Sequence, residues 1–141
     1  MSFAVNVESL LTEFESFPLR YLNLLDNYCR GDEVHLSEED FNLATIHLSP
    51  FVQNVLRTVC DVGYGKTITY GQLAQMAGCP KAIRAVASAL GKNPLPVIIP
   101  CHRVLAKNGL GGYAFGLELK KKLLEFEQNQ FFMSLNRQAS P

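Results

Sequence analysis

The sequence predicts an α+β fold, in which a small α/β N-terminal cap precedes a mostly helical C-terminal domain. A chain of 141 residues with 48% hydrophobic residues is long and apolar enough to bury one domain core with a small appendage. Apolar side chains recur at helical spacing after Ser49-Pro50. The net charge changes sign at the same point. The sequence before it contains nine acidic and two basic residues, and the sequence after it contains eleven basic and four acidic residues.

Three segments follow from these observations. We expect a cap at residues 1–48, a main domain at residues 49–127 and a C-terminal tail at residues 128–141. In the cap, Pro18 is predicted to open an amphipathic helix that Gly31 closes. Short strands are predicted at residues 3–7 and 41–46.

The main domain is predicted to begin with a helix capped by Ser49, with Pro50 in its first turn. A second helix starts at the capping box formed by Thr69 and Gln72 and stops at Gly78.

A third helix is expected at residues 81–90, directly after a tight turn. Two short helices joined in this way are typical of a helix-turn-helix, although many helical hairpins bind no DNA. A last helix is predicted at residues 116–127, with Leu119, Leu123 and Phe126 inward and the lysines at 120–122 partly outward.

Composition excludes several classes of protein. No apolar run reaches the roughly 20 residues of a membrane span, and the N-terminus lacks the pattern of a signal peptide. We therefore expect a soluble, cytoplasmic protein that contacts no membrane. Its four cysteines lack the spacing of a zinc site, so we expect free thiols and no metal. The glycine-rich residues 63–66 lack the full phosphate-loop pattern, and we reject nucleotide binding there.

Cys101 and His102 are adjacent, after Pro100. A thiol becomes a good nucleophile only when it loses its proton, and an imidazole is the usual acceptor. Neighbouring side chains often diverge, so such a pair needs a bridging water, and a carboxylate would be needed to orient the imidazole. For an isolated Cys-His pair, a buried apolar thiol beside a hydrogen-bonded histidine is the favoured explanation.

The wider pattern resembles the O6-alkylguanine-DNA alkyltransferase family, over residues 49–127. The residues that carry the resemblance are Tyr70, the segment Pro80-Lys81-Ala82-Ile83-Arg84-Ala85-Val86, Gly91-Lys92-Asn93-Pro94, Ile99-Pro100-Cys101-His102-Arg103-Val104, Gly112-Tyr113, Gly116, Lys120 and Leu123-Leu124-Glu125-Phe126-Glu127. The resemblance implies a DNA-repair protein that transfers an alkyl group from O6-alkylguanine to its own cysteine. Such a thioether does not hydrolyse readily, so each molecule acts once and needs no cofactor.

The resemblance also implies a role for each catalytic residue. Cys101 matches the alkyl acceptor, His102 the water-linked base and Glu127 the carboxylate that orients this base. Asn93 matches the residue that braces the turn around the cysteine. Tyr70 matches the tyrosine that contacts the flipped base and helps to protonate the departing guanine.

The family's second helix of the helix-turn-helix lies in the minor groove of double-stranded DNA, and Arg84 matches the side chain that fills the space of the extruded nucleotide. By the same resemblance, we expect DNA contacts from Lys81, Ala85 and Arg103. The remaining matches belong to the base pocket: Val104, Tyr113 and Ala114, with the carbonyls of Cys101 and Val104 reading the guanine amine. We expect a monomer.

Two positions in the loop beside the pocket depart from the family pattern: Ala114 stands where some relatives have serine, and Phe115 where many have glycine. Three other functions remain open. A protein that flags alkylated guanine without repairing it would have tryptophan in place of the cysteine. A cysteine hydrolase would need an oxyanion hole. A helix-turn-helix regulator would leave Cys101, His102 and Glu127 together unexplained.

Overall fold

The structure is a computed structural model that describes residues 7–139, with the side chains of residues 17–137. The chain forms two compact units, one up to Val34 and one from His35 onward. This division lies before the predicted boundary after residue 48, and residues 35–48 belong to the second unit. A physical reason is that the Gln53 side chain donates to the carbonyls of Thr45 (2.8 Å) and Leu48 (3.1 Å), which ties this segment to the following helix.

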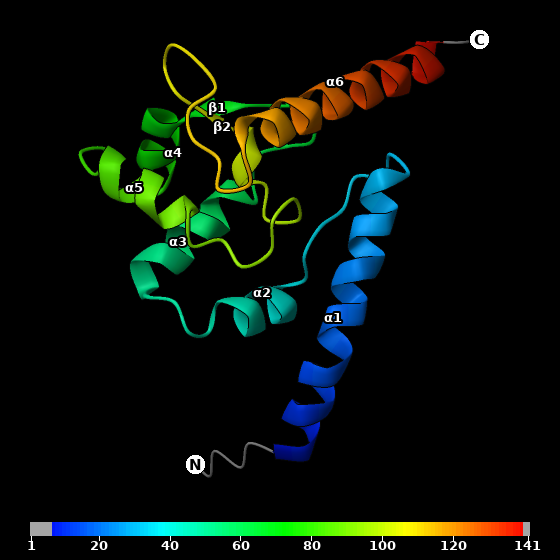
Figure 1. Ribbon diagram of the computed structural model, residues 1–141, viewed down its shortest axis with the longest axis vertical. Coiled ribbons are helices and arrows are strands. Elements are labelled where there is room, and N and C mark those ends of the chain that lie inside the picture. The colour runs from blue at the N-terminus through cyan, green and yellow to red at the C-terminus, as the bar shows by residue number, and fades with distance from the viewer. Residues whose placement is uncertain (1–6, 140–141) are drawn as a thin grey trace. The chain divides into compact units, whose positions relative to one another are not determined.

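The first unit consists mainly of one helix, α1 (Val7–Cys29) (Figure 1). Pro18 lies inside this helix and does not open it, contrary to the prediction. Gly31 follows the helix with a φ of 93°, as a closing glycine should. Of the strand predicted at residues 3–7, residues 3–6 lie outside the described residues, and Val7 is already helical.

The strand predicted at residues 41–46 is also wrong, because this segment lies in and just after helix α2 (Glu38–Thr45). Ser37 caps the helix by accepting a hydrogen bond from the Asp40 N–H, at 3.1 Å. Three acidic residues fill the first turn, where the helix dipole favours negative charge. These N-terminal signals outweigh the apolar pattern that favoured a strand.

Helices α3 (Pro50–Val59), α4 (Tyr70–Met76) and α5 (Ile83–Leu90) form the core of the second unit (Figure 1). Both predicted N-caps are confirmed: Ser49 accepts from the Val52 N–H at 3.3 Å, and Thr69 forms the capping box with Gln72. The apolar side chains of these helices meet in the core; those buried are Val52, Val55, Leu56, Val59, Leu73, Ala74, Val86, Ala89 and Leu90.

Two short strands connect the start of α4 to the segment after Cys101. β1 (Ile68–Thr69) pairs in parallel with β2 (Val104–Leu105), with Ile68 opposite Val104. A single 3-10 turn, η1 (Cys101–Arg103), precedes β2. The pairing therefore places Tyr70, at the first position of α4, beside the chain that carries Cys101.

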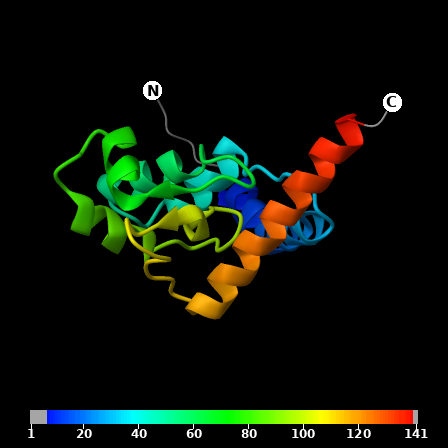
Figure 2. The same ribbon diagram turned by 90° about the horizontal axis from the view of Figure 1, so that it is seen from above.

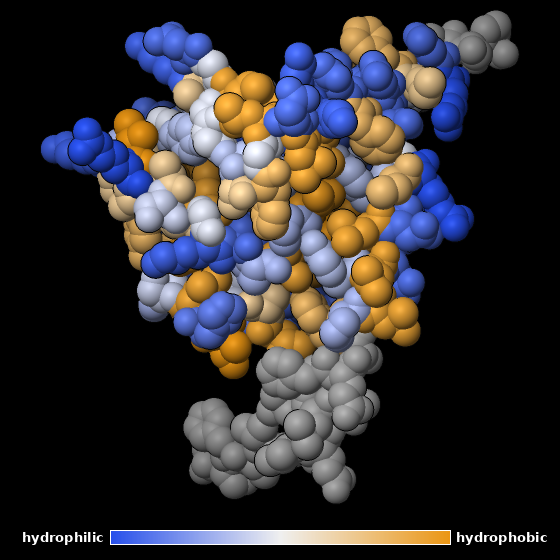
Figure 3. Space-filling model, viewed as in Figure 1, coloured by the Kyte–Doolittle hydropathy of each residue, from blue (hydrophilic) through white to orange (hydrophobic). Residues whose placement is uncertain are grey.

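Helix α6 (Leu117–Ala139) is longer than the sequence predicted, and most of the expected tail at 128–141 is helical. Residues 117–139 contain neither glycine nor proline, so no local signal stops the helix. Its C-terminal half extends past α3–α5 in both ribbon views (Figures 1 and 2). Apolar side chains such as Phe132 and Met133 remain exposed there, and Figure 3 shows apolar patches among hydrophilic side chains along this edge.

The inward face of α6 also differs from the prediction. Lys120 is fully buried, whereas Leu119 is 41% exposed. None of the described helices is both long and apolar enough to cross a membrane.

Candidate active site

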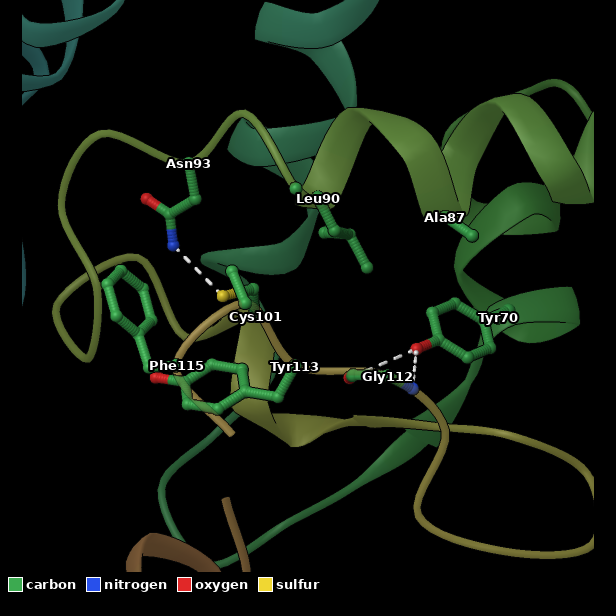
Figure 4. A pocket seen from close by; sticks show the side chains of 10 residues that line it. Tyr70, Ala87, Leu90, Asn93, Cys101, Gly112, Tyr113 and Phe115 are labelled. Carbon is green, nitrogen blue, oxygen red and sulfur yellow. Dashed lines mark hydrogen bonds between the residues drawn. The ribbon is translucent and has the colours of Figure 1, made fainter. Parts of the chain in front are cut away.

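A pocket of about 440 Å³ opens beside Cys101 (Figure 4). Its walls come from the start of α4, the end of α5, the turn after α5, and the loop before α6. The lining residues are Tyr70, Ala87, Leu90, Gly91, Asn93, Cys101, Gly112, Tyr113, Ala114 and Phe115. Mostly apolar walls with a few polar groups are typical of a site for a small molecule.

Asn93 braces the turn that presents Cys101. Its side-chain amide donates to the Cys101 Sγ at 3.1 Å and to the Ile99 carbonyl at 2.8 Å, and its Oδ1 accepts from the Leu95 N–H at 2.8 Å. Val97, within this turn, has a φ of 74°, a strained conformation for a β-branched residue. The two Asn93 hydrogen bonds to Leu95 and Ile99 hold the backbone on both sides of that residue.

Cys101 is 8% exposed and lines the pocket. Burial raises the pKa of this thiol, while the Asn93 hydrogen bond, nearby backbone groups and the Lys120 charge act against that increase. The resting group is thus a neutral thiol, and it needs a base before it can act as a nucleophile.

His102 and Glu127 form a buried pair beneath Cys101. The His102 ring is fully buried, and its Nε2 contacts the Oε2 of Glu127. Burial alone would raise the pKa of Glu127, but the hydrogen bonds and charges of His102 and Arg103 outweigh it and lower this pKa from 4.5 to about 2. An ionised carboxylate only accepts hydrogen bonds, so Nε2 is the donor to Glu127, and in the neutral form of the ring Nδ1 holds the lone pair.

The Tyr70 hydroxyl lies across the pocket from Asn93, against the loop before α6 (Figure 4). It accepts from the Gly112 N–H at 3.2 Å and lies 3.5 Å from the Gly112 carbonyl. Gly111 has a φ of 72°, and a Cβ there would lie 2.8 Å from the Tyr70 ring. Glycine is therefore required at position 111 for the loop to pass under the tyrosine.

The part of the sequence that forms this pocket matches a known protein family. Residues 50–129 match the family described as 6-O-methylguanine DNA methyltransferase, DNA binding domain. The chain belongs to this methyltransferase family.

Relatives with curated names agree with this. A probable methylated-DNA–protein-cysteine methyltransferase of Acanthamoeba polyphaga mimivirus is 42% identical over 107 residues, which cover 76% of this chain and 70% of that protein. The methylated-DNA–protein-cysteine methyltransferase of Methanocaldococcus vulcanius is 51% identical over 83 residues, 59% of this chain and 50% of the relative. The chain thus spans only half to about two thirds of these relatives.

Solved structures show the same fold. The O6-methylguanine methyltransferase of Mycobacterium tuberculosis has a TM-score of 0.64 at 33% identity, covering 77% of this chain and 64% of the other. The O6-methylguanine-DNA methyltransferase of Pyrococcus kodakaraensis has a TM-score of 0.56 at 41% identity, covering 60% and 49%.

The structure brings most of the predicted methyltransferase site together. Asn93, Cys101, Tyr70, Tyr113 and Ala114 line one pocket, with His102 and Glu127 behind it. In the part of the chain that the structure describes, no group of three side chains could hold a metal ion.

Val104 does not line the pocket, although it was expected there. Its side chain is fully buried, and its carbonyl accepts a hydrogen bond from the Lys120 Nζ at 2.6 Å. This carbonyl is thus already engaged by the protein.

Arg103 is not at the surface, where the sequence analysis expected a DNA contact. The residue is 7% exposed. Its Nε donates to the Glu127 Oε1 at 2.7 Å, and one terminal nitrogen donates to the Val62 carbonyl at 2.7 Å. These internal partners turn the guanidinium away from solvent. Lys81, Arg84 and Ala85, by contrast, are exposed at the start of α5.

Lys120 is a site residue that the sequence analysis missed. Its ammonium donates to the carbonyls of Val104 and Leu110, and to that of Gly112 at 3.0 Å. It therefore joins β2 to the loop that carries one wall of the pocket. Three consecutive lysines are the pattern of a solvated helix face, and only the carbonyls gathered by the fold make burial of the first one favourable.

The other cysteines lie outside the pocket. Burial and the neighbouring Asp61 raise the pKa of Cys60 to about 11, so this thiol is poorly suited to act as a nucleophile. Cys29 is exposed and Cys79 is partly exposed, and neither lines the pocket.

Replacing Lys120 by methionine should destabilise the protein by about 2 kcal/mol, because three carbonyls lose a charged donor. The measurement is urea unfolding at neutral pH. Lys121→Met is the matched control, since this neighbouring side chain is exposed on the same helix; its expected effect is within about 0.5 kcal/mol. Equal effects of the two substitutions would contradict the role assigned to the buried ammonium.

Glu127 should make stability depend on pH in acid. Its pKa in the folded protein, about 2, lies below the ordinary value of 4.5. Its contribution is therefore fully present above pH 4.5 and is lost as pH falls towards 2; the shift corresponds to about 3 kcal/mol. Glu127→Gln should be less stable near neutral pH and should lose less stability on acidification.

Urea unfolding of both proteins over this pH range gives the comparison. Glu125→Gln, at an exposed position on the same helix, is the control and should follow the wild type. A Glu127→Gln curve parallel to that of the wild type throughout would show that the carboxylate titrates normally in the folded state.

Proposed function

We propose that this chain repairs DNA by transferring the alkyl group of O6-alkylguanine irreversibly to Cys101. The observation that carries this proposal is the pocket: Cys101 lines it, and the next residue, His102, forms a buried pair with Glu127. Both lie in the region that matches the methyltransferase family. A protein that only flags alkylated guanine has no need of a nucleophile, and the family match favours a methyltransferase over a hydrolase.

His102 acts as the base in this reaction. Because Nε2 donates to Glu127, the lone pair of Nδ1 can take the thiol proton through one bridging water. Nδ1 is buried and makes no hydrogen bond to a protein atom among the described residues, so it is available for such a water.

The transfer itself is an in-line displacement. The thiolate sulfur attacks the alkyl carbon, the S–C bond forms and the C–O6 bond breaks with its electron pair going to the guanine. The guanine takes up one proton at the side of the Tyr70 hydroxyl, which balances the proton lost by Cys101. The product is a thioether, which no group in the site can hydrolyse, so the protein acts once.

DNA reaches the site along α5. Ala87 lines the pocket, and Arg84 lies one turn earlier on the same helix, exposed. We propose that α5 lies in the minor groove, where Arg84 enters the base stack while the damaged nucleotide turns into the pocket. Lys81 and Ala85 flank Arg84 and would contact the backbone, so affinity should decrease with salt.

Two further points belong to the proposal. The protein acts as a monomer, because one copy supplies every residue of the site. It acts in the cytoplasm, where a reducing environment keeps Cys101 as a free thiol.

A duplex with one O6-methylguanine should add a single methyl group to the protein. Intact-mass spectrometry followed by peptide mapping is the measurement, and the methyl should lie on Cys101 and stop at one per chain. Cys101→Ala should lose transfer but keep binding to the damaged duplex. Cys79→Ser is the control and should transfer normally. Binding without any mass change in the wild type would favour a flagging protein instead.

Arg84→Ala should slow repair of duplex DNA more than transfer from the free O6-methylguanine base, since only the duplex needs a wedge to stabilise the extruded nucleotide. Single-turnover rates on the two substrates give the comparison. Equal losses on both would remove Arg84 from the wedge role.

A further inference from the structure

The glycine-rich loop at residues 62–65 surrounds the buried ion pair of Arg103 and Glu127. The Val62 carbonyl accepts from the Arg103 guanidinium at 2.7 Å, and the Tyr64 ring centroid lies 5.5 Å from the guanidinium carbon. The Gly65 N–H donates to the Glu127 Oε1 at 3.4 Å. Because the sequence analysis rejected nucleotide binding at these glycines, it assigned no role to this loop.

The two oxygens of the Glu127 carboxylate contact different partners. Oε2 contacts the His102 Nε2, while Oε1 accepts from the Arg103 Nε at 2.7 Å and from the Gly65 N–H. A carboxylate bound on both oxygens cannot rotate about its last bond. The imidazole of His102 is therefore held at a fixed angle by groups that never reach the pocket.

We propose that Arg103 and the 62–65 loop form a positioning clamp, which fixes Glu127 and through it the imidazole that activates Cys101. The proposal rests on the proposed function and assigns Arg103 to the transfer step rather than to DNA binding. Arg103 is a positioning residue, because it touches neither Cys101 nor the pocket.

The rear of the clamp is formed by the C-terminal part of α6. Gly65 has a φ of 76°, and a Cβ there would lie 2.9 Å from the Cβ of Phe131. This close approach lets the loop backbone reach the Glu127 carboxylate, one turn earlier on the same helix. The residues that the sequence suggested were a tail thus help to position the relay.

Electrostatics gives the clamp a second effect. Burial raises the pKa of Glu127, and the Arg103 charge is one of the factors that keep it low. Without Arg103, the carboxylate should take up a proton at a higher pH. A protonated Glu127 no longer orients the imidazole as a pure acceptor, so transfer should decline at a higher pH than in the wild type.

The test compares Arg103→Met with Arg103→Lys. The first-order rate of methyl transfer within the protein–DNA complex should decrease by about 10- to 100-fold in the methionine variant, as small displacements of a catalytic group do. Lysine keeps the charge but cannot span both partners, and it should restore part of the rate. The acid limb of the rate profile should move to higher pH in the methionine variant. Affinity for damaged duplex, measured in the Cys101→Ala background, should be unchanged.

Arg30→Met is the matched control, since Arg30 is an exposed residue of the other unit that forms a surface ion pair with Asp26 at 3.1 Å. It should show the wild-type rate and pH profile. A wild-type rate and profile in Arg103→Met would overturn the clamp. A loss of affinity with an unchanged rate in the complex would make Arg103 a DNA contact.

A second assay separates the clamp from the repair activity. Iodoacetamide alkylates Cys101 without DNA: the sulfur–carbon bond forms and iodide leaves, and the rate follows activation of the thiol. Cys101 in Arg103→Met should react more slowly with iodoacetamide. If that variant does not fold, Tyr64→Leu is measured in its place; it leaves every charge unchanged and should also react more slowly. A wild type inactive on DNA would refute the proposed function, and the iodoacetamide rates would still decide whether the clamp exists.

Discussion

The buried carboxylate of Glu127 is the group on which the rest of the site depends. It is 1% exposed and carries a full negative charge, which is unfavourable in a protein interior unless it is fully paired. His102 and Arg103 supply that pairing from the turn that also bears Cys101. The need to neutralise one buried charge therefore joins α6 to the catalytic turn.

Lys120 provides a second buried charge on the same helix, seven residues earlier. Its partners are carbonyls rather than carboxylates, so it ties down backbone: the end of β2 and the loop on the far side of the pocket. Glu127 and Lys120 lie about two turns apart on α6 and face the same interior. One helix thus fixes both the relay behind Cys101 and the wall opposite Asn93.

Local signals in the sequence were sufficient for the features that depend on neighbouring residues. Ser49, Thr69 and Gln72 cap their helices as predicted, because a cap involves atoms only two or three residues apart. The strand predicted at 41–46 failed because the pattern of Phe41 and its neighbours suits both a strand and a short helix, and the cap at Ser37 decides between them.

Long-range contacts could not be predicted in this way. The burial of Lys120 and the inward turn of Arg103 depend on carbonyls and a carboxylate contributed by distant segments. The grouping of Cys101, His102, Glu127 and Asn93 was anticipated only through the family resemblance, since nothing in their spacing shows that residues 25 apart meet. The same resemblance did not indicate that Arg103 is buried, because a motif match transfers a residue's identity without its orientation.

The state of Cys101 suits an acceptor that reacts only once. A thiolate exposed to solvent would react with any electrophile or oxidant, and a protein without turnover could not recover from such a reaction. Here burial keeps the thiol neutral, while the means of removing its proton lie behind it and out of solvent. Under the proposed function, the alkyl-bearing base has to fit between Tyr70 and Asn93 to reach this thiol, so the shape of the pocket would restrict which large electrophiles react.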